Sequence, residues 1–179
     1  MAANKISLPL LFGLIAALCS ILFVLGTYLA GPSVFLGWPS YLGILIIVLI
    51  AAIAATVEKR AKGGVLDFRG ALKVAYGTLA LGVIGQNFFT WLLLDVIDPA
   101  FKQRLIPVML ANTEKAYRAI GAPQDELQHA LENVRSQDQF SLGRFIQGMG
   151  FLLVIYFLVA LLIAVTIKSK KGPAPKLES

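Results

Sequence analysis

Two neighbouring amides, Gln86 and Asn87, are the most polar side chains within the long apolar stretches of this sequence. An amide surrounded by hydrocarbon needs a hydrogen-bond partner from protein or from water. Such a pair can bond to another helix, or it can form one wall of a polar path for a solute. Solute paths normally also contain an ionisable residue, and the apolar stretches place no acidic or basic residue in the bilayer interior. The pattern therefore favours hydrogen bonding within the protein.

His129 is the single histidine, and Asp125, Glu126 and Glu132 follow or precede it at helical spacing. Imidazole and carboxylate groups bind divalent metals, and histidine titrates near neutral pH. One imidazole among mobile carboxylates is also an ordinary solvated helix face, and this is the interpretation we prefer to a metal site at His129. Because the sequence also lacks a recognisable nucleophile motif and a zinc-binding HExxH, it predicts no catalytic residue, no enzyme and no cofactor.

These residues must be positioned by an unusually apolar chain. It has 179 residues, of which 58% are hydrophobic and 15% charged, and its mean hydropathy is +0.77. Four stretches are long enough to cross about 30 Å of hydrocarbon as helices, and the first is too long for a cleaved signal peptide. They cover about residues 8–30, 41–57, 71–94 and 145–167. We predict an all-α membrane protein with four transmembrane helices, in a single membrane domain over residues 1–179.

The distribution of charge predicts the orientation of the spans. Cytoplasmic connections are rich in Lys and Arg, and the basic residues cluster before the first span, between the second and third, and after the fourth. The basic residues of these clusters are Lys5, Lys59, Arg60, Lys62, Arg69, Lys73, Lys168, Lys170, Lys171 and Lys176. Aromatic residues that suit the headgroup region, Tyr28, Trp38, Tyr41 and Trp91, fall at the opposite ends. Both signals place the N- and C-termini in the cytoplasm.

The connection between the third and fourth spans, about residues 95–144, is too long for a structureless loop. Asp98-Pro99 is a typical helix start, because an aspartate caps the first turn and a proline needs no N–H partner there. Pro107 should kink or end this first helix. Gly121-Ala122-Pro123 should then separate it from a second helix. We predict an extracytoplasmic helical hairpin in which Leu127, Leu131 and Val134 pack against Met109, Ile120 or the headgroup plane.

Small residues predict where helices approach closely. Gly77, Gly82 and Gly85 make the third span slim, and Ala160 and Ala164 give the fourth span a matching face. That face can receive the third span or a second copy of the protein. A hinge that opens for a substrate is the alternative interpretation of the glycines. After the fourth span, a short segment at about residues 169–179 is predicted to be a disordered cytoplasmic tail.

Several of these features together resemble one family. They are the order of the four spans, the entry Phe68-Arg69-Gly70-Ala71-Leu72 to the third span, its exit Val96-Ile97-Asp98-Pro99, and an acidic helical insert with a Gly121-x-Pro123 break. The chain resembles the uncharacterised membrane proteins of Bacteroidetes that carry domain of unknown function 4199. The resemblance implies a location in the bacterial inner membrane, with no assigned activity.

The leading hypothesis for function is a non-catalytic accessory or assembly protein whose outer helical insert binds a partner protein or a second copy. The alternative is a small oligomeric transporter or channel. The two hypotheses differ in whether Gln86, Asn87 and Thr90 face a water-filled axis or bond within the bundle. The net charge of +6 is explained by orientation in the membrane, so we expect the lipid bilayer, and no nucleic acid, as the neighbour of the basic clusters.

Overall fold

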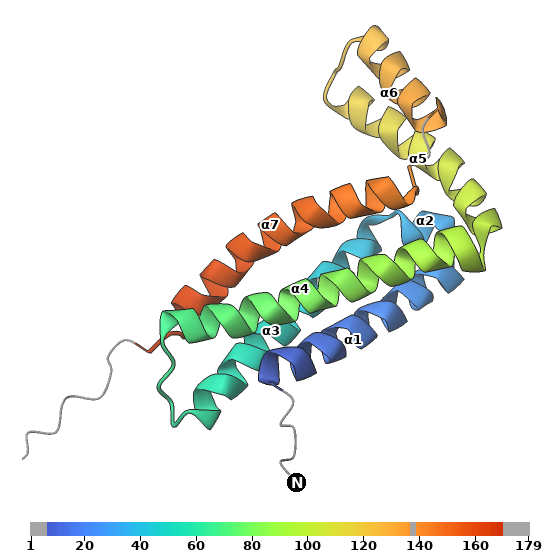
Figure 1. Cartoon of the computed structure of the whole chain (residues 1–179). Helices are drawn as coiled ribbons and strands as arrows, with labels where there is room; N and C mark the ends of the chain where they lie inside the picture. Colours follow the sequence, from blue (N-terminus) through green and yellow to red (C-terminus); the bar gives the residue numbers. More distant parts are fainter. Residues whose placement is uncertain (1–6, 137–138, 170–179) are drawn as a thin grey trace, which may run out of the picture.

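The computed structural model describes residues 7–136 and 139–169, and every regular element in this part of the chain is helical (Figure 1). Five of the described helices have at least 20 residues, and a π-helical turn continues the helix that ends at Leu92. In chain order the elements are α1 (Leu8–Ala30), α2 (Pro32–Phe35), η1 (Trp38–Tyr41), α3 (Leu42–Ala61), α4 (Phe68–Leu92), η2 (Leu93–Ile97), α5 (Pro99–Ala119), α6 (Gln124–Ser136) and α7 (Leu142–Ile167).

Four helical segments are long and apolar enough to cross a membrane, and this confirms the predicted all-α fold with four membrane-spanning helices. They are Leu8–Ala30, Trp38–Ala61, Phe68–Ile97 and Leu142–Ile167. The second extends past the predicted limit of residue 57 through Glu58, Lys59 and Arg60. Backbone hydrogen bonding carries a helix beyond the point where its apolar sequence ends, and long charged side chains at its end reach water.

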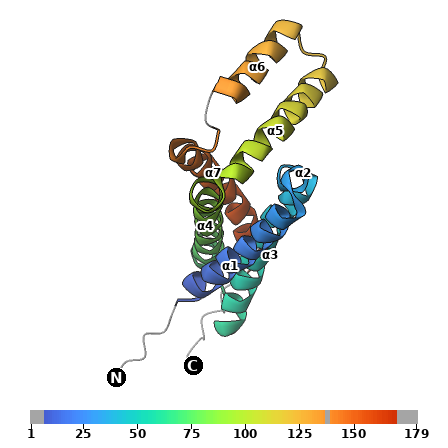
Figure 2. The same cartoon turned by 90° about the vertical axis from the view of Figure 1, so that its right-hand side faces the viewer.

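The four spans form a bundle around α4, which packs against α1, α3 and α7. In Figure 1, α4 runs between α7 and α1, and α3 lies behind it; Figure 2 shows the same grouping from the side. The bundle has two different ends. We call the end that carries Leu8 and Ile167 the terminal end, and the end from which α5 and α6 project the hairpin end.

The closest approach between spans lies along the seam between α1 and α4. A β-carbon placed on Gly85 would lie 2.7 Å from Cβ of Ala17, and one on Gly13 would lie 2.6 Å from Cδ1 of Leu81. One on Gly82 would lie 3.1 Å from Cβ of Ala16. The glycines therefore act through close packing, which in lipid is a main source of helix association. On α7, the helix face formed by Ala160 and Ala164 packs against α4 of the same chain, and both residues are fully buried.

A threonine in the core of the bundle is poorly accommodated. Thr78 on α4 is 0% exposed, and its hydroxyl has no hydrogen-bond partner among the described residues. Ser20 is equally buried, but its hydroxyl donates to the Ala16 carbonyl at 2.7 Å. A buried hydroxyl without a partner costs roughly 1–3 kcal/mol relative to an apolar group of the same shape.

We therefore expect Thr78→Val to stabilise the protein, because valine keeps the branched shape of threonine and removes the unpaired hydroxyl. The gain should be about 1 kcal/mol, seen as a higher melting temperature of the purified protein in detergent. Ser20→Ala is the matched control and should be neutral or destabilising, since it removes a hydroxyl that is paired. A lower melting temperature for Thr78→Val would show that this hydroxyl has a partner.

The terminal end of the bundle is closed by hydrogen bonds. Lys59 Nζ donates to the carbonyl of Ile167 at 2.8 Å, where the dipole of α7 also favours a cation. Ser169 exchanges two hydrogen bonds with Leu66, at 2.9 and 3.0 Å, and its hydroxyl donates to the Gly64 carbonyl at 2.9 Å. The prediction that the disordered tail begins at Ser169 is therefore wrong for that residue, and residues 170–179 lie outside the described part of the chain.

At the other end, α5 and α6 stand away from the bundle (Figure 1). α5 contacts α2 and η2 at its base, whereas α6 contacts α5 alone among the described elements. Leu127 is buried between the two helices, but Ile120 lies at the turn and is 77% exposed. The predicted packing against Ile120 is therefore wrong. Pro107 lies inside α5, and the helix continues past it. The predicted alternative in which Pro107 ends a short first helix is therefore wrong.

Candidate functional site

Gln86 and Asn87 lie in the half of α4 nearest the hairpin end, and they have different surroundings. Asn87 Nδ2 donates to the Val83 carbonyl of its own helix at 2.9 Å. The Gln86 amide has no hydrogen-bond partner among the described residues, although its backbone carbonyl accepts from Thr90 Oγ1 at 2.8 Å. Successive helix positions point about 100° apart, which accounts for the difference. Neither amide bonds to another described helix; Asn87 bonds within the protein through the backbone of its own helix, and the Gln86 side chain does not.

The Gln86 side chain lines a cleft of about 270 Å³ that all four spans enclose. Phe35 and Ser40, from the segment between α1 and α3, contribute to the end of the cleft nearest the hairpin. The rim includes Tyr41 of η1 and Ile44 of α3, which are 71% and 41% exposed. The lining residues are Phe23, Val24, Thr27, Phe35, Ser40, Tyr41, Ile44, Val83, Gln86, Asn87, Thr90, Leu152 and Tyr156.

Most polar groups in the cleft already donate hydrogen bonds within the protein. Thr27 Oγ1 donates to the Val24 carbonyl at 2.9 Å, and Ser40 Oγ donates to the carbonyls of Val34 and Phe35. No lining residue is a carboxylate, an amine, a guanidinium, an imidazole or a thiol. The cleft is therefore a mainly apolar, uncharged space in which the Gln86 amide and the hydroxyls of Tyr41 and Tyr156 have no hydrogen-bond partner among the described residues.

The cleft does not continue toward the terminal end as an open path. Below it, Ile47, Leu79, Val83 and Tyr156 form a packed cluster in which each residue is at most 3% exposed. Thr90 and Asn87 bond to carbonyls of α4 and do not face one another across an axis. A single copy of the protein therefore offers a pocket with one closed end.

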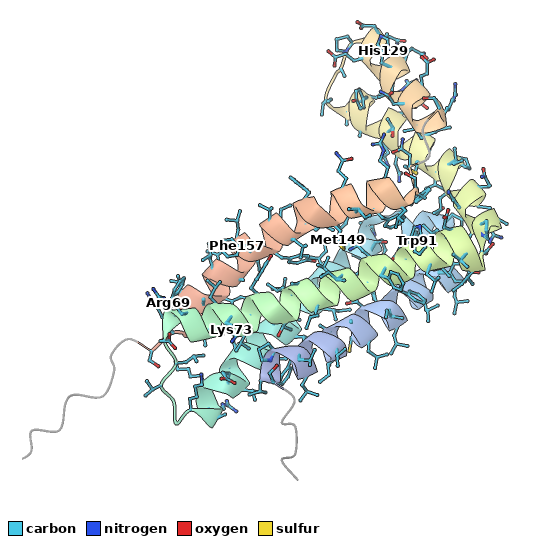
Figure 3. The ribbon with its side chains drawn as sticks, in the orientation of Figure 1. Arg69, Lys73, Trp91, His129, Met149 and Phe157 are labelled. Atoms are coloured by element: carbon cyan, nitrogen blue, oxygen red, sulfur yellow. The ribbon has the colours of Figure 1, made fainter. Side chains whose placement is uncertain are left out.

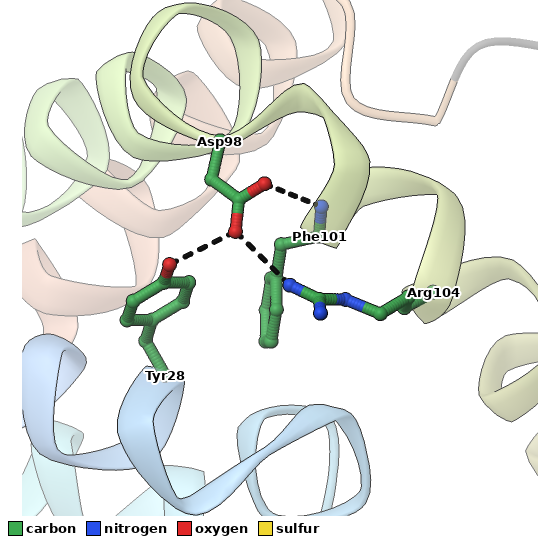
Figure 4. A network of polar contacts seen from close by, with 4 residues as sticks. All are labelled: Tyr28, Asp98, Phe101 and Arg104. Carbon is green, nitrogen blue, oxygen red and sulfur yellow. Dashed lines mark hydrogen bonds and ion pairs between the residues drawn. The ribbon is translucent and has the colours of Figure 1, made fainter.

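A polar junction beside the cleft fixes the base of the hairpin (Figure 4). Asp98 caps α5, accepting from the Phe101 N–H through Oδ1 at 2.9 Å, and Pro99 occupies the first helical position as the sequence predicts. The second carboxylate oxygen of Asp98, Oδ2, accepts from the Tyr28 hydroxyl at 2.9 Å and from Arg104 at 3.0 Å. One carboxylate therefore joins the end of α1, the start of α5 and a cation one turn further along.

An aromatic cluster supports this junction. The Phe101 ring is 2% exposed and meets the rings of Tyr28 and Phe35 edge to face, with centroids 4.7 and 5.3 Å apart. The Arg104 guanidinium lies 5.2 Å from the centre of the same ring. Asp95 forms a separate ion pair with Lys102 at 2.9 Å. Sequence analysis missed Phe35 and Phe101, and it placed Tyr28 only at the membrane interface.

The junction lowers the pKa of Asp98 below its ordinary value of 3.8. The causes are the hydrogen bond from Tyr28, the Phe101 N–H and the charge of Arg104, while partial desolvation opposes them. A carboxyl with a lowered pKa in the folded state stabilises the fold above its ordinary pKa, and this contribution disappears as the pH falls through the lowered value.

We therefore expect amide hydrogen exchange in the first turn of α5, corrected for its intrinsic pH dependence, to show constant protection from about pH 7 to pH 5. Protection should fall below about pH 4, as protonation removes the charge that Tyr28 and Arg104 recognise. Asp98→Asn should abolish this pH dependence, and Asp95→Asn should keep it. A loss of protection centred near neutral pH would assign the dependence to another group.

The remaining candidates lie apart from the cleft. His129 is exposed near the far end of the hairpin (Figure 3), and the described residues contain no group of three or more His, Cys, Asp or Glu side chains that could hold a metal. Trp91 and Met149 lie where α4 faces α7. The indole N–H of Trp91 is buried and has no partner in the described part of the chain.

Comparisons with known proteins agree with the resemblance found in the sequence. The family described as "Protein of unknown function (DUF4199)" matches residues 11–169. The match runs from the first turn of α1 to the end of α7 and includes the cleft, the junction and the hairpin. No curated protein and no solved structure matches the chain.

Proposed function

Given that the chain belongs to the DUF4199 family, whose function is unknown, we propose that it is a non-catalytic accessory or assembly protein of the bacterial inner membrane. In this proposal the α5–α6 hairpin binds a partner protein outside the membrane. The observation that carries the proposal is the isolation of the hairpin, in which α6 contacts α5 alone. A folded helix such as α6, which has no contact with the spans among the described residues, needs another reason to be held in place.

The junction at Asp98 supports the same proposal. It fixes the base of the hairpin to α1 through Tyr28 and buries Phe101 against α1 and α2. A binding surface held in one orientation loses less conformational entropy when a partner binds. The outer faces of the hairpin are rich in exposed charged residues of both signs, including Lys115, Arg118, Glu126 and Arg135. Charge of this kind suits the steering and selection of a protein partner.

The proposed orientation, with both termini in the cytoplasm, rests on charge. Arg69 and Lys73 lie at the terminal end of the bundle, far from His129 on the hairpin (Figure 3). Basic residues near short connections favour the cytoplasmic side. In a Cys19→Ala background, single cysteines at Ser33 and Gln128 should react with an impermeant maleimide added to intact cells. Cysteines at Lys62 and Arg69 should react only after lysis, and their reaction in sealed cells would overturn this orientation.

Partner binding is tested by crosslinking in native membranes. A photoreactive side chain at Gln128 should give a defined adduct of higher mass, whose mass separates a second copy from another protein. The paired reversal Lys115→Glu and Arg118→Glu should remove the adduct. Arg144→Glu, an exposed charge at the start of α7 outside the hairpin, should retain it. Absence of an adduct in the wild type, or its persistence in the paired variant, would contradict the proposal.

The alternative, a small oligomeric transporter or channel, has less support. It requires a polar path, and the described cleft ends at the cluster of Ile47, Leu79 and Val83. The cleft also lacks the charged groups that normally accompany coupled transport. In this alternative, symmetric copies of the protein would enclose a shared axis. The mass of the crosslinked adduct tests this directly, because it separates a second copy from another protein.

A further inference from the structure

We propose that the cleft beside Gln86 is a binding site for an uncharged, membrane-dissolved molecule with a hydrocarbon body and one carbonyl or hydroxyl group. The hydrocarbon body packs against the apolar lining, and the polar group bonds to the Gln86 amide. This site is separate from the hairpin surface of the proposed function, so either proposal can fail without the other.

The position of the cleft determines how an occupant enters. Its walls come from all four spans, and its rim includes Ile44, which is 41% exposed on the lipid-facing side of α3. Gln86 is the nineteenth residue of the thirty in the Phe68–Ile97 segment, close to the middle of that span. A molecule already dissolved in the hydrocarbon therefore reaches Gln86 without crossing the headgroup region.

The hydrogen-bonding capacity of the lining selects the polar group. Thr27, Ser40 and Asn87 donate to backbone carbonyls of this chain, and Thr90 donates to the Gln86 carbonyl. The Tyr41 and Tyr156 hydroxyls also belong to the lining, and each can bond to the same polar group as Gln86. The Gln86 side chain has two N–H donors and one carbonyl acceptor, and none has a partner among the described residues. A ligand carbonyl can accept from Nε2, and a ligand hydroxyl can also donate to Oε1.

Charge and size limit the ligand further. The lining has no cationic or anionic side chain, and an ionised carboxylate or phosphate at this depth would have no counter-charge. The volume of about 270 Å³ lies just below the usual range for ligand sites, so only a small molecule fits. A plain hydrocarbon chain would fill the space but leave the amide unpaired, so the cleft discriminates in favour of a neutral molecule with a polar group.

The test uses the full chain in lipid nanodiscs and three diazirine-bearing probes of equal length: dodecanol, dodecane and dodecanoate. The dodecanol probe should crosslink to cleft residues such as Phe23, Ile44 and Leu152. In the wild type, an excess of dodecanol without the diazirine should suppress this crosslinking. Gln86→Leu should reduce cleft labelling about threefold to tenfold, the effect of one hydrogen bond. Gln147→Leu, an exposed amide on α7, is the matched control and should not reduce it.

Equal cleft labelling by dodecane would overturn the role of the amide, and equal labelling by ionised dodecanoate would overturn the preference for an uncharged ligand. Dodecanol adducts spread evenly over the lipid-facing surface, without competition, would overturn the site itself. The competition experiment needs no variant, so a Gln86→Leu protein that fails to fold does not obscure the result.

Discussion

Gly85→Ala is expected to destabilise the bundle strongly, by about 1–3 kcal/mol, because the new methyl group has no room. It would lie 2.7 Å from Cβ of Ala17, and neither atom belongs to a side chain that can rotate away. The seam between α1 and α4 must therefore open along its length. The expected measurement is a lower melting temperature in detergent, with insertion into the membrane unchanged, since alanine is well tolerated in a transmembrane helix.

The steric cause of the destabilisation by Gly85→Ala can be separated from the general effect of replacing glycine by alanine in a helix. Gly26 and Gly148 also lie inside spanning helices, and a β-carbon on either would meet nothing within 4 Å. Alanine at these positions should be neutral or stabilising, because it has the higher helix propensity. Ala17→Gly should rescue Gly85→Ala by moving the missing methyl group across the seam. A double variant no more stable than Gly85→Ala alone would contradict the steric explanation.

Phe101→Ala should release the base of the hairpin, with a local cost of about 3–5 kcal/mol. The ring is 2% exposed, and the substitution removes its contacts with Tyr28, Phe35 and Arg104 together. We expect faster hydrogen exchange over residues 99–105 and easier proteolysis of α5 from the hairpin side. The bundle itself should melt as before, because the packed cluster around Leu79 and Tyr156 does not include Phe101.

Ile120→Ala is the control for this prediction. It removes an aliphatic side chain of the same hairpin, but Ile120 is 77% exposed and makes little packing contribution. Exchange at residues 99–105 should not change. If Ile120→Ala and Phe101→Ala loosened the hairpin equally, the aromatic cluster would not be its anchor.

The spans and the helix start at Asp98 could be predicted from the sequence because they depend on local properties. Apolar length reports a spanning helix directly, and an Asp-Pro pair needs only its own backbone to cap a turn. The helices extend beyond the apolar stretches: α3 continues to Ala61 and α4 begins at Phe68, since helical hydrogen bonding does not stop where hydrophobicity does.

The surroundings of the candidate residues could not be predicted, because they depend on distant parts of the chain. Asn87 finds a partner in its own helix, while Gln86 faces a space created by three other spans. The contact between Tyr28 and Asp98 joins residues 70 positions apart. Aromatic residues near span ends hinted at the cluster, but headgroup placement explained them equally well, and Phe101 lies beyond any span.

The hydroxyl groups of the spans have a consequence for how the protein is made. Ser20, Thr56, Thr90 and Thr166 each donate to a carbonyl of their own helix, four residues earlier. Each of these groups is satisfied before its helix meets another. α1 can therefore leave the translocation machinery and wait in lipid until α4, its main partner, has been synthesised. In such a two-stage assembly, the glycine seam would bring α1 and α4 together by shape complementarity and not by polar attraction.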